Sequence, residues 1–238
     1  MERINQFLAR RGVASRRSAD ALLREGRVLI NGVRAEIGAQ VDGIRDVVTV
    51  DGKPVRKKAI VTTIMLNKPT GIVTTLADPD SRPTVLSLVP EIPGLVPVGR
   101  LDTDSSGLLL LTTDGDLCHA LTHPRYRVEK EYVVTVDTPP TDEQLQRLKK
   151  GVVLEDGFAR PARVLGNPRK RTIAIVMREG RKREVRRICR AVQLKVVRLE
   201  RVRIGSLMLG TLPTGSWREL TRDELAQLRP PTGDSRTK

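Results

Sequence analysis

The sequence predicts an α+β protein that consists of a small N-terminal module and a larger domain of mixed sheet and helix. Two observations support this fold class. Within the first 55 residues, two short amphipathic helices precede two hairpin turns. From residue 59 onward, apolar runs typical of strands are interrupted by few helices, without the regular alternation of a βαβ protein. The 238 residues suffice for a catalytic domain plus one small module.

The two helices of the N-terminal module have clear boundaries. The first helix ends at Gly12, and Ser15 caps the second helix, which ends at Gly26. Each helix places apolar side chains on one face, with the spacing of i, i+3 and i+4 that a packed helix shows. These apolar residues are Ile4, Phe7 and Leu8 in the first helix, and Ala19, Leu22 and Leu23 in the second.

Two hairpin turns follow these helices. Asn31-Gly32 and Asp51-Gly52 lie between β-branched runs, and both dipeptides favour the left-handed conformations that two-residue hairpin loops need. We place the boundary of the module at residue 58, with the basic residues 56–58 as a linker.

The larger domain is predicted over residues 59–228. Capping-box patterns at Thr141 and Thr221 indicate the starts of two helices, and Gly151 closes the first of them. A third helix is expected over 183–191. Residues 229–238 are rich in proline, glycine and charge, which predicts a disordered tail. The expected strands are 60–66, 108–111, 128–136, 172–177 and 196–204.

The charge of the chain indicates a polyanionic partner. The formal net charge is +15 and the sequence pI is about 10.7, as expected for a nucleic-acid-binding protein. An anionic membrane is disfavoured because no apolar run approaches the roughly 20 residues of a spanning helix. No apolar segment of a secretory signal follows Met1, so we expect a cytoplasmic protein. Aromatic residues make up 2% of the chain, which argues against extended stacking platforms for single strands.

The sequence does not predict a metal site, a disulfide framework or a nucleotide cofactor. Cys118 and Cys189 are far apart and form no CxxC pair. His119 and His123 share a helix face at i, i+4, but no third ligand with suitable spacing follows them. Glycine-rich phosphate-binding motifs are absent from the sequence.

The most informative stretch is a polar loop that leads into a fully apolar run. Asp102 and Asp104 lie in this loop, and residues 108–111 are four consecutive leucines typical of a buried strand. The order places Asp102 at the rim of a buried sheet, where catalytic side chains are often held. From the residues alone, a structural turn and a catalytic carboxylate are both open.

The N-terminal module resembles the S4 RNA-binding domain over about residues 2–55. The resemblance depends on the combination of positions and not on one of them. It implies an RNA-binding fold in which Arg3, Arg16 and Arg17 contact RNA. The matching residues are Arg3, Leu8, Gly12, Ser15-Arg16-Arg17, Ala19, Gly26, Val28 and Ile30-Asn31-Gly32.

The larger domain resembles the RsuA/RluB-type pseudouridine synthases of bacterial ribosomal RNA. The run from Gly99 to Thr112 is similar to the GRLDxxxxGLLLLT signature of that family, with Ser105-Ser106 where some members carry threonine. Four further segments resemble family motifs. These are Asn67-Lys68-Pro69-Thr70-Gly71, Arg82-Pro83-Thr84-Val85, Lys130-Glu131-Tyr132, and the run from Glu179 to Ile188.

The resemblance implies a mainly antiparallel catalytic sheet and a set of site residues. Asp102 is the expected catalytic carboxylate, Tyr132 is expected to stack on the target base near the proton that carbon five loses, and Arg186 is expected to position Asp102 by an ion pair. We expect a monomer that acts without a cofactor on ribosomal RNA or a ribosomal assembly intermediate. Further RNA contacts are expected from Arg100, Lys68, Lys130, Arg181, Lys182, Arg183 and Arg187.

Three alternatives stay open at this stage. The run from Glu179 to Ile188 and the Arg82-Pro83-Thr84-Val85 segment resemble the large-subunit (23S) branch of the family more than the small-subunit (16S) branch. A ribosome-associated RNA-binding protein without catalysis would explain the charge and the first module, but not the carboxylate loop. A nuclease would require clustered carboxylates or histidines for metal. Whether Asp102 acts covalently or electrostatically is not decided by the sequence.

Overall fold

The computed structural model describes residues 1–43, 45–55 and 61–228. These residues form two compact units. One unit consists of residues up to 63 together with 91–96 and 112–117, and the other contains the remaining segments. The expected boundary at residue 58 and the expected tail over 229–238 lie outside the described residues.

The two N-terminal helices form as the sequence predicts. Helix α1 (Ile4–Arg10) ends before Gly12, which adopts a φ of 72°. Helix α2 (Arg16–Arg24) begins after Ser15, whose side chain accepts a hydrogen bond from the backbone N–H of Ser18. This cap satisfies one of the helix's orphan donors. Both predicted helices are therefore confirmed.

The hairpin turns of the N-terminal module are also confirmed. Asn31 and Gly32 have φ values of 52° and 82°, and Asp51 and Gly52 have values of 50° and 74°. The four-stranded sheet that they connect has the order β3-β2-β5-β6, and β1 pairs separately with β4. The core between helices and sheet includes Ile4, Phe7, Leu8, Leu23, Val28, Val41 and Val48. The strands are β1 (Glu2–Arg3), β2 (Val28–Ile30), β3 (Val33–Arg34), β4 (Gln40–Val41), β5 (Val48–Val50) and β6 (Lys53–Pro54).

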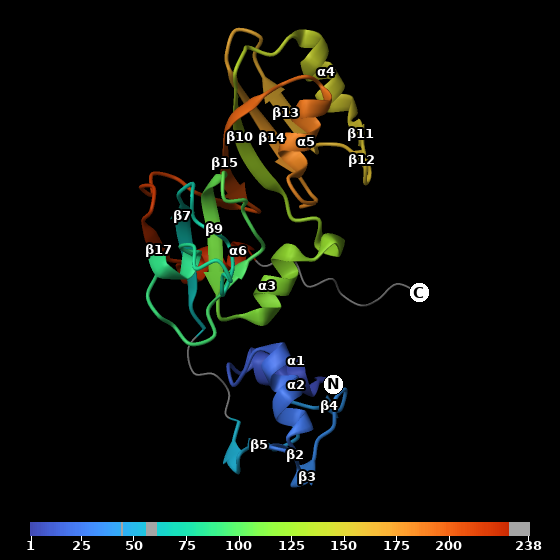
Figure 1. The fold of residues 1–238 in the computed structure, drawn as a ribbon, viewed down its shortest axis with the longest axis vertical. Coiled ribbons are helices and arrows are strands. Elements are labelled where there is room, and N and C mark those ends of the chain that lie inside the picture. Colours follow the sequence, from blue (N-terminus) through green and yellow to red (C-terminus); the bar gives the residue numbers. More distant parts are fainter. Residues whose placement is uncertain (44, 56–60, 229–238) are drawn as a thin grey trace. The chain divides into compact units, whose positions relative to one another are not determined.

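A nine-stranded sheet forms the centre of the larger domain (Figure 1). Its main path has the order β13-β14-β10-β15-β9-β7-β17, with β16 beside β15 and β8 beside β9. The pair β15–β9 is parallel, whereas the pairs of β10 with β14 and β15 are antiparallel. The strands are β7 (Thr63–Lys68), β8 (Val96–Val98), β9 (Ser106–Thr112), β10 (Lys130–Val136), β13 (Arg163–Gly166), β14 (Thr172–Met177), β15 (Val196–Ile204), β16 (Leu207–Met208) and β17 (Trp217–Glu219).

Three helices pack against different strands of this sheet. Helix α4 contacts β13, α5 contacts β15, and α6 contacts β16. The predicted capping box at Thr141 is present, and a reciprocal pair of hydrogen bonds joins Thr221 and Glu224 at the start of α6. None of the described helices is long and apolar enough to cross a membrane. The helices are α3 (Gly115–Thr122), α4 (Asp142–Lys150), α5 (Glu184–Ala191) and α6 (Arg222–Leu228), with short 3-10 turns at Val85–Leu88 and Pro124–Tyr126.

The sequence did not predict the two-stranded hairpin of β11 (Val152–Leu154) and β12 (Gly157–Ala159). Its strands are only three residues long and partly exposed, so they carry no clear alternation. The hairpin contacts α5, and Figure 1 shows it beside that helix.

Candidate active site

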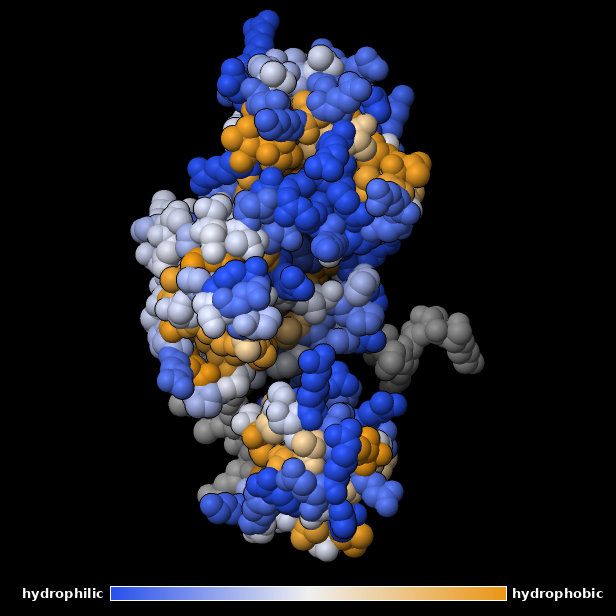
Figure 2. Space-filling view, in the orientation of Figure 1, coloured by the Kyte–Doolittle hydropathy of each residue, from blue (hydrophilic) through white to orange (hydrophobic). Residues whose placement is uncertain are grey.

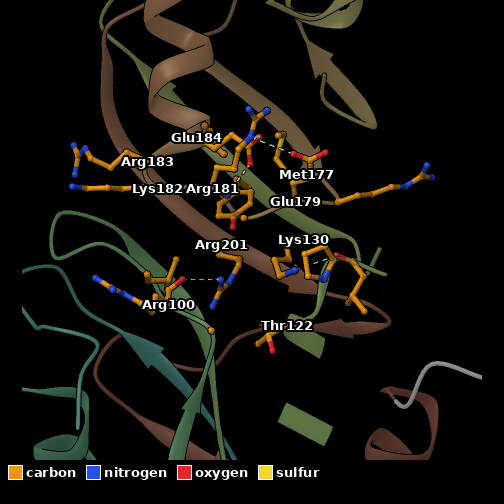
Figure 3. A pocket seen from close by; sticks show the side chains of 18 of the residues that line it. Arg100, Thr122, Lys130, Met177, Glu179, Arg181, Lys182, Arg183, Glu184 and Arg201 are labelled. Atoms are coloured by element: carbon orange, nitrogen blue, oxygen red, sulfur yellow. Dashed lines mark hydrogen bonds and ion pairs between the residues drawn. The ribbon is translucent and has the colours of Figure 1, made fainter. Parts of the chain in front are cut away.

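A cleft of about 1190 Å³ lies in the larger domain (Figure 3). Its walls come from the loop before β9, strands β10, β12 and β15, and the segment that leads into α5. Asp102, Tyr132, Lys130, Arg100 and Arg183 all line it. The structure therefore brings together residues that are far apart in the sequence and that were expected at one site.

The backbone around Asp102 forms a tight turn that is tied to its surroundings. The N–H of Ser105 donates to the carbonyl oxygen of Asp102 (3.0 Å), and the N–H of Gly71 donates to that of Thr103 (2.8 Å). The hydroxyl of Thr74 donates to the carbonyl oxygen of Leu101 (2.8 Å). The loop is thus rigidly positioned, while the side chain of Asp102 remains 32% exposed.

Lys68 lies beneath this loop and is completely buried. Its ammonium group donates to the carbonyl oxygens of Asp102 (3.2 Å), Ser105 (2.9 Å) and Pro69 (2.9 Å). Burial lowers the pKa of Lys68 to about 8, against the opposing attraction of nearby carboxylates. This placement corrects the expectation that Lys68 contacts RNA, because all three donors are used on the protein's own backbone.

Arg201 is a second buried cation behind the loop, with 2% of its surface exposed. Its Nε donates to the carbonyl oxygen of Leu108 (2.7 Å) and its Nη1 to that of Arg100 (3.3 Å). Figure 3 shows the second of these bonds as a dashed line. Arg201 therefore connects β15 to both ends of the segment that carries Asp102.

The close pairing of β9 and β15 depends on a glycine. Gly107 has a φ of 104°, and a Cβ at this position would lie 2.3 Å from the carbonyl oxygen of Arg201. A side chain is therefore excluded both by the backbone conformation and by the neighbouring strand. Gly107 allows the two strands to meet where the Asp102 loop joins the sheet.

The cationic partners of the carboxylate loop differ from those expected. Arg186 contacts Asp104: its Nη2 donates to the backbone carbonyl oxygen (2.8 Å) and its Nε lies 3.4 Å from the carboxylate. The expected ion pair between Arg186 and Asp102 is therefore corrected. Arg183 is the guanidinium that approaches Asp102, at 4.0 Å, while it holds Asp104 with two hydrogen bonds of 3.0 and 2.8 Å.

The physical reason for this exchange lies at the start of α5. Arg183 is the residue before the helix and has a left-handed backbone, with a φ of 51°. Its side chain consequently leaves the helix axis toward the carboxylate loop. The pKa of Asp104 is lowered, mainly by its hydrogen bonds with Arg183, so this carboxylate is held in its charged form.

Tyr132 and Lys130 lie two residues apart on β10, and alternate residues of a strand point to the same side. Both side chains line the cleft, and Tyr132 is buried. Lys130 donates to the carbonyl oxygen of Val128 (3.2 Å), and burial lowers its pKa to about 8. The cleft thus has a desolvated cation next to the expected stacking residue.

The floor of the cleft is apolar. Leu199 and Tyr132 come from neighbouring strands, and Leu101, Met177 and Val185 complete the surface. All five side chains are buried. A flat apolar ligand, such as a pyrimidine ring, could pack here while its polar edge meets the charged wall.

Two arginines of the basic run have protein partners instead of free guanidinium groups. Arg181 donates to Glu184 (2.9 Å), to Asp156 (3.2 Å) and to the carbonyl oxygen of Phe158 (2.9 Å). Arg187 donates to the carboxylate of Asp156 (2.8 Å). Both hold the β11–β12 hairpin where phosphate contacts were expected. Lys182 and Arg100 are exposed at the cleft and remain available to RNA.

The expected RNA-binding arginines of the N-terminal module are accessible. Arg3, Arg16 and Arg17 are exposed. Among the described residues, no ion pair involves them. Arg10 and Arg11 are less available, since Arg10 pairs with Glu2 and Arg11 lies 4.9 Å from the centre of the Phe7 ring.

The two histidines lie close together at the C-terminal end of helix α3. The rings of His119 and His123 lie 4.8 Å apart, next to Tyr126. Within residues 1–43, 45–55 and 61–228, no group of three or more histidine, cysteine or acidic side chains could hold a metal ion.

Sequence reasoning missed Arg201 and the supporting role of Lys68. Arg201 lies in a strand of alternating charged and apolar residues, where a cation is normally exposed. Only its position opposite Gly107 indicates burial. Lys68 is the last residue of the buried strand β7, and its place shortly after the apolar residues 64–66 is a signal for burial that composition alone does not carry.

Two family models match the chain. The model described as RNA pseudouridylate synthase matches residues 62–191, and the S4 domain model matches residues 2–43. An uncharacterized RNA pseudouridine synthase of Aquifex aeolicus is 47% identical over 95% of this chain and 93% of that protein. The ribosomal large subunit pseudouridine synthase B of Vibrio cholerae is 42% identical over 96% of this chain and 74% of that protein. A crystal structure of a pseudouridylate synthase superposes with a TM-score of 0.69 and 30% identity, covering 96% of this chain and all of that one.

Proposed function

This chain belongs to the RNA pseudouridylate synthase family, and from that premise we propose that it isomerises one specific uridine of large-subunit (23S) ribosomal RNA to pseudouridine. The Vibrio cholerae relative is named for action on the large ribosomal subunit, which supports large-subunit ribosomal RNA as the substrate. The net charge of +15 and the S4 domain support a large structured RNA as the partner.

The observation that carries the proposal is the position of Asp102. Its backbone is held by hydrogen bonds to the loop, so the carboxylate lies at the edge of a cleft that is lined by apolar and cationic side chains. The target uridine lies in folded RNA, so it enters the cleft by flipping out of its stack, at a cost of a few kcal/mol. The uracil ring then packs against Tyr132 and Leu199, and the ribose faces Asp102.

The reaction needs no group from outside the protein and RNA. The bond between ribose C1′ and uracil N1 breaks, the uracil rotates, and C1′ bonds to C5. The C5 proton leaves, and N1 carries a proton in the product, so atoms and charge balance. Asp102 acts on the ribose as the first bond breaks, by covalent attachment or by stabilising positive charge on the sugar. We assign the phenol of Tyr132, which lines the same cleft, to removal of the C5 proton.

Cations support this chemistry without touching the reacting atoms. Arg183 holds Asp104 and approaches Asp102, which keeps the second carboxylate from repelling the first. Lys68 and Arg201 hold the backbone on both sides of the loop. We assign these three residues to positioning, in place of the role expected for Arg186. Arg100, Lys130 and Lys182 are proposed to contact the phosphates that flank the target.

The test is modification of defined RNA. Purified protein is incubated with transcripts of large- and small-subunit ribosomal RNA, and pseudouridine is mapped by carbodiimide labelling and primer extension. We expect one modified position in the large-subunit transcript. Asp102→Asn should abolish modification while RNA binding stays within a few-fold of wild type. Asp104→Asn, the matched change in the same loop, should keep measurable turnover.

Each contrary outcome would assign this protein a different function or target. Modification of the small-subunit (16S) transcript would move the target to that RNA. Binding without modification would indicate a ribosome-associated binding protein, and strand scission would indicate a nuclease. Turnover by Asp102→Asn at the wild-type rate would remove Asp102 from the reaction.

A further inference from the structure

The β11–β12 hairpin exposes two apolar side chains on one of its faces. Val153 and Phe158 are directly opposite each other in the antiparallel register, so their side chains share a face. They are 80% and 59% exposed, respectively. Phe158 is one of only two phenylalanines in the chain. A phenylalanine so exposed, in a protein with so few aromatic residues, has no role in the core.

The tip of the Phe158 ring lies against the backbone of Gly151. A Cβ at Gly151 would lie 2.5 Å from the ring, so the ring rests against the bare glycine backbone, which has a φ of 93°. More than half of Phe158 stays accessible. The absence of a side chain at residue 151 therefore gives the tip of the ring a place to rest, while most of the residue stays accessible.

The hairpin is held in place by the basic segment of the active site. Arg181 donates to the carbonyl oxygen of Phe158 and to Asp156, and Arg187 donates to the other oxygen of Asp156. These contacts fix the hairpin to α5. The exposed ring is thus rigidly placed relative to the residues that surround Asp102.

Phe158 also lines the same cleft as Asp102 and Tyr132. The cleft volume of about 1190 Å³ exceeds the 300–1,000 Å³ typical of sites for one small ligand, so it has room for more than the flipped nucleotide. Arg160 and Lys182, both exposed, lie on the wall with Phe158. In Figure 2 an apolar patch over the hairpin lies directly next to a hydrophilic band. An open aromatic face beside cations suits an unpaired base with its phosphates.

We propose that Phe158 stacks on an unpaired base adjacent to the target uridine and thereby holds the RNA strand in the opened form. The inference rests on the proposed function and adds a residue that recognises the RNA beside the target. Val153 extends the apolar surface under the same base, and Arg160 and Lys182 contact the neighbouring phosphates. The hairpin is then the part of the catalytic domain that distinguishes an open loop from a paired stem.

The experiment compares variants on the large-subunit fragment that the wild-type protein modifies. Dissociation constants are measured at fixed salt, and modification is measured under single-turnover conditions. Phe158→Ala should weaken binding about five- to 150-fold, the range for loss of one base–aromatic stack. Phe158→Trp should bind within twofold of wild type, and Phe158→Leu should behave like the alanine variant. The matched control is Leu165→Ala on β13, which is also 59% exposed but does not line the cleft; it should bind like wild type.

A second arm places the contact on the RNA. Abasic substitution at the nucleotide on either side of the target should, at one of the two positions, remove the difference between wild type and Phe158→Ala. Three results would overturn the proposal: Phe158→Ala binding within twofold of wild type, Phe158→Leu matching wild type, or a dimer in sedimentation that Phe158→Ala converts to monomers. Failure of the wild-type protein to modify any ribosomal transcript would instead contradict the proposed function.

Discussion

Asp102, the carboxylate that we propose for catalysis, has a fixed backbone and a partly exposed side chain. The loop receives hydrogen bonds from the hydroxyl of Thr74 and from Lys68, whereas the Asp102 carboxylate is approached by Arg183 at 4.0 Å. Positioning through the backbone leaves the carboxylate oxygens available to the ribose. Such preorganisation avoids rearrangement during the reaction.

Tyr132 provides a test of chemistry against packing. Tyr132→Phe keeps the ring on the apolar floor but removes the hydroxyl near the C5 proton. We expect RNA binding and thermal stability close to wild type and a loss of roughly 100-fold or more in the single-turnover rate, the contribution typical of general acid–base catalysis. The measurement is tritium release from C5-labelled transcript. Full activity of this variant would leave Tyr132 with a stacking role alone.

Lys130 provides a test of buried charge. Burial lowers its pKa from 10.5 to about 8, so between these values the unfolded chain binds more protons than the folded chain and stability rises with pH. Lys130→Met should therefore stabilise the protein at pH 7 by about 1–3 kcal/mol, because the desolvation cost of a partly buried ammonium group is removed. The gain should shrink between pH 8 and 10.

This prediction is checked by urea unfolding at pH 7, 8, 9 and 10. The exposed Lys182→Met serves as the control and should leave the pH dependence unchanged. Lys68, whose pKa is also lowered to about 8, should leave a residual rise in the Lys130→Met variant. A variant less stable than wild type at pH 7 would show that the ammonium group makes favourable contacts in the cleft.

At the scale of elements, the parallel pair of β9 and β15 decides where the active site forms. The two strands come from distant parts of the chain. Their pairing places Ser106 opposite Glu200 and Gly107 opposite Arg201. Because β10 lies on the other side of β15, Tyr132 comes next to the loop of Asp102. The cleft is therefore a consequence of strand order.

Gly107→Ala should break this pair. The added methyl group would meet the carbonyl oxygen of Arg201 at 2.3 Å, and the φ of 104° is itself unfavourable for alanine. We expect a loss of at least about 3 kcal/mol in the free energy of unfolding. Gly215→Ala is the control: its φ is 81°, but no atom lies within 4 Å of the added carbon, so the loss should be about 1–2 kcal/mol.

The comparison is made by chemical denaturation of both variants. Equal losses would mean that the backbone conformation, and not the approach of β15, sets the requirement for glycine at residue 107. A folded Gly107→Ala protein should also show reduced modification, because the Asp102 loop would shift with β9.

At the scale of the whole molecule, the chain forms two compact units, to which we assign different tasks. The N-terminal module has its own helix caps, hairpin turns and core, and its Arg3, Arg16 and Arg17 are exposed. The larger domain contains the cleft and the carboxylate. We expect that the first unit supplies affinity and site selection, whereas the second supplies the reaction.

Removal of residues 1–55 should leave a folded catalytic domain with weaker and less selective RNA binding. Each phosphate contact that is lost should flatten the slope of log K against log salt by roughly 0.7 to 0.9. In the full chain, replacing Arg16 and Arg17 by glutamine should flatten the slope by about two such contacts without changing the modified position. Filter binding between 50 and 300 mM salt measures both slopes. An unchanged slope in the truncated protein would mean that the module does not hold phosphates.

The sequence by itself determined the local features of this protein. Ser15, Thr141 and the Asn31-Gly32 turn act within a few residues of themselves, so their structures follow from neighbours in the chain. The four leucines of β9 required a buried strand, and the Asp102 loop before them had to lie at its rim. The family motifs likewise identified the family before any coordinates.

Only the tertiary structure decided which cations serve the carboxylates. Arg183, and not Arg186, approaches Asp102. The reason is that helix α5 begins at Glu184, so Arg183 precedes it and adopts a left-handed conformation. Lys68 and Arg201 are buried because segments 34 to 101 residues away in the chain supply their carbonyl partners. Burial and pairing of this kind depend on packing between distant segments, which no local pattern of residues encodes.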